Sequence, residues 1–92
     1  MASTTGLVTS IEVTRDTGKV FVQATGLPPE IFFLWFFLGT RDIVTGDDVS
    51  AFDRVRHSMW IAMLQRAQDA GRQVTIRHAA NGSFATAVSV GT

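Results

Sequence analysis

The stretch from residue 31 to residue 38, Ile-Phe-Phe-Leu-Trp-Phe-Phe-Leu, contains no polar side chain. A helix that crosses a bilayer needs about 20 apolar residues, so this run is too short to be a transmembrane segment. It has the composition of a β-strand that is apolar on both faces, with residues 31, 33, 35 and 37 on one side. Such strands are covered on both faces. In a single small domain, we expect another copy of the chain to cover the second face.

The overall composition favours the same expectation of self-association. The chain is 46% hydrophobic and 17% charged, whereas charged residues make up about 25% of an average soluble domain. A chain of 92 residues forms one domain, and a domain of this size buries only about 60–65% of its unfolded surface. We therefore predict a homo-oligomer. Residues 1–6 are expected to be a flexible N-terminus, and residues 7–92 a single folded domain.

The charges and the missing cysteines exclude several classes of protein. Eight Lys and Arg balance eight Asp and Glu, so no long-range attraction to nucleic acid is expected, and the aromatic run has no interleaved basic residue. Without cysteine there is no disulfide, no thiolate nucleophile and no cysteine metal site. The first residues lack the basic and apolar segments of a secretory signal. The predicted location is the cytoplasm, or outside the cell if a signal has been removed.

Strand and turn signals divide the chain into five strands. The segments with alternating or continuous apolar character are residues 7–15, 19–24, 31–38, 73–78 and 83–90. Asp16-Thr17-Gly18 and Asn81-Gly82 predict hairpin turns between the first two strands and between the last two. Two prolines end the second strand, because proline cannot donate a hydrogen bond to a sheet.

A helix is predicted over residues 51–70. Ser50 and Asp53 have the spacing of a capping box, and Gly71 stands where a helix commonly ends. On a helical projection the apolar residues cover roughly twice the 100° stripe that a surface helix needs. This arc contains Phe52, Val55, Met59, Ala62, Met63, Ala67 and Ala70, widened by Trp60 and Leu64. Ile61 falls on the polar side with Arg54, His57, Gln65 and Gln68.

The aromatic strand and the wide helix face are therefore predicted to form the contacts between copies. The residues assigned to this interface are Phe33, Trp35, Phe37, Trp60, Ile61 and Leu64. The element order β-β-β-α-β-β is that of the OB-fold, a partly open Greek-key barrel with its helix between the third and fourth strands. We predict a mainly β protein with one helix, built as an OB-fold-like small barrel. The alternative is an open antiparallel sheet with one helix packed on it.

The second half of the chain combines a helix ending Leu64-Gln-Arg-Ala-Gln-Asp-Ala-Gly71, the strand Val74-Thr-Ile-Arg77 and a return strand ending Ala87-Val-Ser-Val90. Over residues 52–90 this arrangement resembles the B subunits of AB5 toxins, most of all the pertussis and subtilase cytotoxin type, and residues 6–13 are similar to the first strand of such domains. The resemblance implies an OB-fold that forms ring pentamers, with helices lining a central pore. It also implies carbohydrate binding at cell surfaces and a second, toxin-like subunit as partner.

We find no catalytic or metal site in the sequence. Asp53, His57 and Ser58 lie close together on the predicted helix, but adjacent helix positions point about 100° apart, so Ser58 does not face the imidazole. His57 and His78 lack the spacing of a zinc site, and no glycine string forms a phosphate loop. We therefore expect no enzyme activity, no metal and no cofactor.

The predicted function is a non-enzymatic, homo-oligomeric binding module, with glycan as the ligand implied by the resemblance. The alternative is a self-assembling scaffold without a small ligand, including an engineered ring. Polar groups at strand ends, beside one tryptophan that could act as a stacking platform, are the ligand candidates. These residues are Trp35, Arg41, Asp42, Arg77 and His78.

Overall fold

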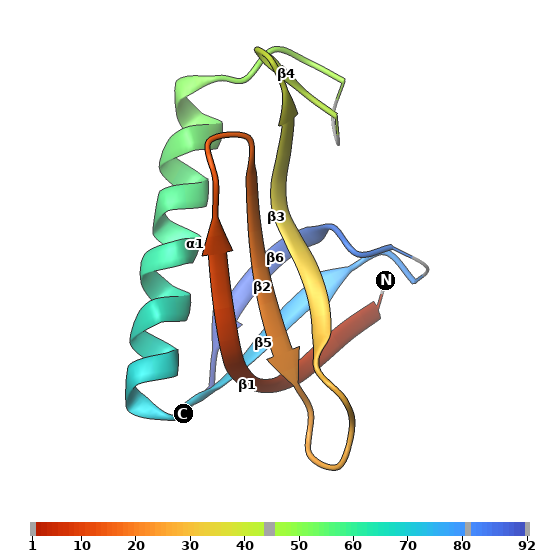
Figure 1. Cartoon of the computed structure of the whole chain (residues 1–92), viewed down its shortest axis with the longest axis vertical. Helices are drawn as coiled ribbons and strands as arrows, with labels where there is room; N and C mark the ends of the chain where they lie inside the picture. The colour runs from red at the N-terminus through yellow and green to blue at the C-terminus, as the bar shows by residue number, and fades with distance from the viewer. Residues whose placement is uncertain (1, 44–45, 81, 92) are drawn as a thin grey trace.

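The fold consists of one curled, six-stranded antiparallel sheet and one helix packed beside it (Figure 1). A computed structural model describes residues 2–43, 46–80 and 82–91. The elements are β1 (Ala2–Val13), β2 (Thr17–Gln23), β3 (Glu30–Leu38), β4 (Arg41–Asp42), α1 (Ala51–Ala70), β5 (Gln73–His78) and β6 (Ala85–Val90). The strand order in the sheet is β4-β3-β2-β1-β5-β6. The predicted mainly β composition with a single helix is confirmed, and the structure adds the two-residue strand β4.

The sheet does not close into a barrel, so the alternative prediction, an open sheet with one helix, replaces the OB-fold-like barrel. The curl of the sheet brings β3 next to the segment that precedes β6. There the N–H of Phe33 donates to the carbonyl of Ser83 at 2.7 Å, and Phe33 forms an isolated parallel bridge with Phe84. A closed barrel needs a continuous ladder between its outer strands. Within the described residues this single bridge is the only β-pairing that joins β3 to the segment leading into β6.

The curl of the sheet comes from β1, which belongs to both of its halves. Residues 2–7 of β1 pair with β5, and residues 7–13 pair with β2. Gly6 lies at the change of partner, and a Cβ there would collide with the backbone of Gln23, which explains why a glycine occupies this bend. Residues 2–6, predicted to be flexible, are therefore strand, because β5 satisfies their backbone. Met1 lies outside the described residues.

A β-bulge decides which side chains of β3 face the core. Gly18 pairs with Trp35 while Lys19 pairs with Phe33, so Leu34 is the additional residue. The bulge interrupts the alternation of faces and brings the neighbours Leu34 and Trp35 into the core together. The predicted face of residues 31, 33, 35 and 37 is therefore wrong. Phe32, Leu34, Trp35 and Phe37 are buried, whereas Ile31, Phe33, Phe36 and Leu38 are half-buried or exposed.

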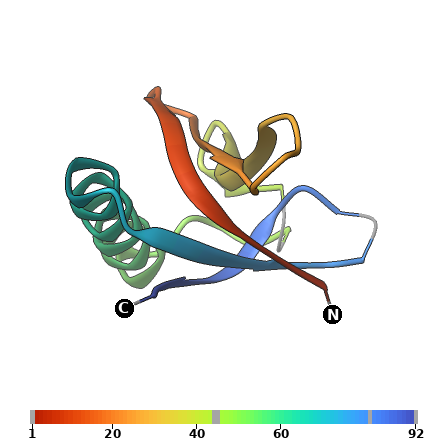
Figure 2. The same ribbon diagram turned by 90° about the horizontal axis from the view of Figure 1, so that it is seen from below.

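The core side chains come from the sheet and from α1, and the view from below shows the helix lying along one side of the curled sheet (Figure 2). Its fully buried side chains are Val20, Val22, Leu64, Val74 and Ile76. Among the described residues, no helix has both the length and the apolar character that crossing a membrane requires.

The helix α1 begins and ends at the predicted residues. The Ser50 hydroxyl accepts a hydrogen bond from the Asp53 N–H, and the Asp53 carboxylate accepts one from the Ser50 N–H, both at 3.1 Å. The hydrogen bond from the Ser50 N–H to the carboxylate, aided by the Ser50 hydroxyl, favours the charged form and lowers the pKa of Asp53. Gly71 ends the helix in the left-handed conformation, with φ of 66°. Local signals thus place the helix correctly in the chain.

Candidate functional site

The side of α1 that faces away from the sheet carries an uncovered apolar stripe. Phe52, Val55 and Met59 have exposed fractions of 85%, 58% and 59%, and Ala62 and Met63 continue the line as an exposed and a half-buried residue. Their spacing of three and four residues places them on one side of the helix. None of the strands in the described residues covers this side (Figure 1). We call these five residues the α1 stripe.

The opposite side of α1 packs on the sheet, and it differs from the predicted one. His57, Leu64 and Ala67 are buried, and Trp60 and Ile61 pack partly buried against the core. Ile61, placed on the polar side by the projection, therefore faces the sheet. The predicted arc was too wide because apolar character alone does not distinguish a core face from an exposed one.

Three of the six residues predicted to form the interface lie in the core of the chain itself. Trp35, Phe37 and Leu64 are buried. The bulge in β3 turns its two aromatic side chains toward the core, and Leu64 enters the core from α1. Such side chains are not available to a second copy. Phe33 is half-buried on the outer face of the sheet, where its ring centroid lies 6.0 Å from that of Phe36.

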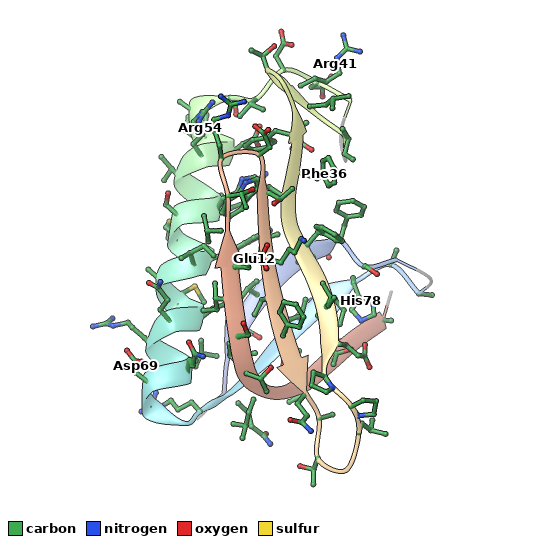
Figure 3. All side chains as sticks on the ribbon, viewed as in Figure 1. Glu12, Phe36, Arg41, Arg54, Asp69 and His78 are labelled. Atoms are coloured by element: carbon green, nitrogen blue, oxygen red, sulfur yellow. The ribbon has the colours of Figure 1, made fainter. Side chains whose placement is uncertain are left out.

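The residues predicted to bind a ligand do not come together. Arg41 and Asp42 form β4 at one edge of the sheet, whereas Arg77 and His78 belong to β5, and β3, β2 and β1 lie between them. Figure 3 shows Arg41 and His78 in separate parts of the molecule. Trp35 is buried beside α1 and joins neither pair. The structure therefore contains no site made of these five residues.

His78 has a structural role in the sheet. Its Nδ1 lies 2.8 Å from the Ala79 carbonyl, and its Nε2 lies 3.1 Å from the Thr4 hydroxyl. Because a carbonyl only accepts, Nδ1 donates to it, and Nε2 forms a second hydrogen bond with the Thr4 hydroxyl. The ring also packs 4.8 Å from that of Phe32. His78 thus ties β1 to β5 and is not free to bind a ligand.

Sequence reasoning missed a pocket between the beginning of α1 and the turn that joins β1 to β2. Figure 3 labels Arg54, which lines it. Two hollows of about 300 and 140 Å³ share three of their lining residues, Arg15, Phe37 and Arg54. The other residues that line them are Asp16, Trp35, Gly39, His57 and Ser58. We call the two hollows together the Arg15–Arg54 pocket.

His57 lines the inner part of this pocket. Its side chain belongs to a residue only 5% exposed, and its ring stacks on Trp35 at a centroid distance of 5.0 Å. The rings of Phe37 and Trp60 lie 5.8 and 5.5 Å from it. Nδ1 is buried and has no hydrogen-bond partner among the described residues. His57 is therefore a polar group enclosed by aromatic rings.

The surroundings of His57 keep its ring neutral. Burial lowers its pKa and the nearby Arg56 acts in the same direction, whereas the carboxylates of Asp42 and Asp53 oppose the shift. A histidine has an ordinary pKa of about 6.5. With its pKa below that value, His57 is neutral at pH 7 and can either donate or accept one hydrogen bond through Nδ1.

The mouth of the pocket is positively charged. The Arg15 side chain is 92% exposed, and its only ion pair within the described residues, to Asp16 at 3.4 Å, is of the weak surface type. Arg54 has no ion pair within the same residues, whereas Arg56 binds Asp53 at 2.8 Å. A cation close to the N-terminus of a helix opposes the helix dipole. Arg54 therefore does not stabilise α1 electrostatically.

One sequence signal could have indicated this pocket. No acidic residue stands three or four positions from Arg54, so an arginine near a helix start has no partner on its own helix. Its approach to Arg15 follows from the position of the β1–β2 turn, which no local pattern gives. In residues 2–43, 46–80 and 82–91, the His, Asp and Glu side chains form no group of three that could hold a metal ion.

Comparison of the chain with known protein families, with curated proteins and with solved structures finds no match. Its function is therefore argued from the α1 stripe and the Arg15–Arg54 pocket.

We expect the free energy of unfolding to fall as the pH is lowered below about 6.5, because unfolding restores the ordinary pKa of His57. Between its lowered folded pKa and this value, the unfolded chain binds more protons than the folded chain. Urea unfolding at pH 7.5, 6.5 and 5.5 measures the effect. In His57→Phe, which keeps an aromatic ring in place, the loss between these pH values should be smaller. An equal loss in both proteins would assign the effect to other groups.

Proposed function

We propose that this chain is a non-enzymatic, homo-oligomeric module whose copies associate through the α1 stripe. The observation that carries the proposal is the exposure of Phe52, Val55 and Met59 on one helix side, which leaves a contiguous apolar surface in contact with water. Contiguous exposed apolar surface on a small domain marks an interaction site. The resemblance to AB5 B subunits, in which helices line the pore of a ring, favours the same surface.

Two further features favour a second copy as the occupant of the stripe. The chain has a formal net charge of zero, so copies do not repel one another over long distances. The edge strand β6 contains neither a charged residue nor a proline, the devices with which natural proteins commonly block pairing between edge strands. Both features favour association between copies of the chain.

Sedimentation at micromolar concentration tests this proposal. We expect the unmodified chain to sediment as an oligomer and Met59→Glu to weaken association at least about tenfold, because the new charge would be buried at the contact. Met59 lies outside the core, so the melting temperature of the monomer should change little. Leu38→Glu, at a residue 71% exposed on β3, is the matched control and should leave the mass unchanged. A folded monomer for the unmodified chain would refute the proposal.

A glycan array separates the two functions that such an oligomer could have. Saturable binding would support the carbohydrate-binding module that the resemblance implies. If no glycan on the array binds and the oligomer is stable, the alternative of a scaffold whose function is its own assembly would be favoured. Native mass spectrometry gives the number of subunits and tests the expected pentamer.

A further inference from the structure

We propose that the Arg15–Arg54 pocket binds a small organic anion, in which a carboxylate or phosphate group is attached to a planar apolar body. Three segments of the chain build the pocket: the β1–β2 turn, the end of β3 and the beginning of α1. The pocket borders the α1 stripe, because Arg54 and Ser58 also line a shallow hollow with Val55, Met59 and Ala62. The observations that carry this proposal are nevertheless different from those that carry the association proposed above.

The charged end of the ligand follows from the two guanidinium groups. Arginine presents paired N–H donors whose geometry matches carboxylate and phosphate oxygens. Arg54 has no ion pair within the described residues, and Arg15 pairs only with Asp16, which lines the same hollow and leaves one net positive charge among the three. The N-terminus of α1 adds positive potential on the same side. Two arginines beside a helix N-terminus repel each other, and an anion between them would relieve this repulsion.

The apolar body follows from the aromatic wall. Trp35 and Phe37 line the pocket with His57, and the Trp35 ring already lies parallel to the imidazole within 21°. Ligand pockets commonly have volumes of about 300–1,000 Å³. The larger hollow, of about 300 Å³, is at the lower limit of this range, and the smaller one, of about 140 Å³, lies below it. A ligand with one ring and one charged group therefore fits better than an extended molecule.

Ser58 supplies an accessible polar contact for such a ligand, and His57 adds a buried nitrogen that a ligand reaches only if the aromatic rings around it shift. His57 is more than nine-tenths buried, lines the pocket, and has an Nδ1 without a partner among the described residues. A buried polar group without a hydrogen bond is uncommon in folded proteins and calls for an explanation. Ser58, an exposed helix residue, adds a hydroxyl at the same hollow. This combination of two cations, aromatic rings and an unpaired nitrogen distinguishes the pocket from the isolated surface arginines Arg41 and Arg77.

Titration of the isotope-labelled protein by NMR at low ionic strength tests the proposal, with benzoate and phenyl phosphate as probes. We expect at least one probe to shift the backbone signals of the lining residues in a saturable manner. Inorganic phosphate, which lacks the ring, and benzamide, which lacks the charge, should bind at least about tenfold more weakly. Saturation by benzoate alone would assign the site to carboxylates, and saturation by phenyl phosphate alone would assign it to phosphates.

Charge-removing variants locate the site. Arg54→Gln should weaken binding of the better probe at least about tenfold, and Arg15→Gln should weaken it in the same direction. Arg41→Gln is the matched control, an exposed arginine on β4, and should leave binding unchanged. Both pocket arginines are exposed, so these variants should keep the fold. The sedimentation of Arg54→Gln, measured in parallel, keeps this result separate from the oligomeric state.

Three results would overturn the proposal. The first is the absence of saturable shifts with both probes. The second is unchanged affinity in Arg54→Gln. The third is an equal loss in Arg41→Gln, which would show attraction to the overall charge of the arginines and not to the pocket.

Discussion

Replacing Trp35 by alanine is expected to lower the free energy of unfolding by about 3–5 kcal/mol. Trp35 is buried, and its ring contacts His57 at 5.0 Å and Phe37 at 6.3 Å between centroids. Small domains have a free energy of unfolding of about 5–15 kcal/mol, so the variant would lose a large part of its stability. Chemical unfolding followed by circular dichroism measures the change.

Leu38→Ala is the matched control for Trp35→Ala. Leu38 belongs to the same strand but is 71% exposed, so its loss should change stability by no more than about 0.5 kcal/mol. Trp35 is not part of the α1 stripe, and any loss of oligomer in Trp35→Ala should therefore accompany unfolding. If the variant melted at the same temperature as the unmodified chain, Trp35 would not be a core residue.

The second large effect is expected for Gly6→Ala, at the bend of β1. The added Cβ would collide with the carbonyl of Gln23 and the nitrogen of Ala24. Both are backbone atoms, which cannot move aside as a flexible side chain can. Insertion of atoms into a packed site costs about 1–3 kcal/mol and sometimes more. We expect a loss of about 3 kcal/mol in the free energy of unfolding, because the strand itself must shift.

Gly91→Ala controls for the substitution itself. A Cβ at Gly91 would make an ordinary contact, 3.5 Å from the Gln73 carbonyl oxygen. It should therefore alter stability far less than Gly6→Ala in the same urea titration. Equal effects of the two substitutions would mean that backbone flexibility, and not the collision at Gln23, accounts for the loss.

The helix could be predicted from the sequence because its signals are local. Ser50, Asp53 and Gly71 act on residues within one turn of themselves, so their positions in the chain suffice. The faces of β3 could not be predicted in this way. The bulge at Leu34 depends on the pairing of Trp35 with Gly18, where any side chain would collide with the Trp35 ring. Such a fit between distant residues has no local signature.

The same distinction applies to the candidate sites. The excess of apolar helix residues indicated an exposed surface, and the structure shows it at Phe52, Val55 and Met59. Trp35, Phe37 and Leu64 were predicted to form the interface between copies, but they lie in the core. Hydrophobic character alone does not distinguish a core residue from an interface residue. The Arg15–Arg54 pocket was missed because two arginines from distant segments meet only after the β1–β2 hairpin has packed beside α1. The predicted closed barrel was wrong for a related reason. Closure requires β3 and β6 to pair along their length, and the pairing of two strands so far apart in the chain has no local sequence signal.

The divided pairing of β1 also affects the order in which the chain can fold. Residues 7–13 find their partner in the adjacent hairpin, but residues 2–7 must wait for residues 73–78. Closing so long a loop costs entropy before the strand contacts repay it, and such non-local pairing slows folding. During synthesis, β1 leaves the ribosome well before β5, so its pairing is completed late, and until then half of its backbone is open to pairing with another chain.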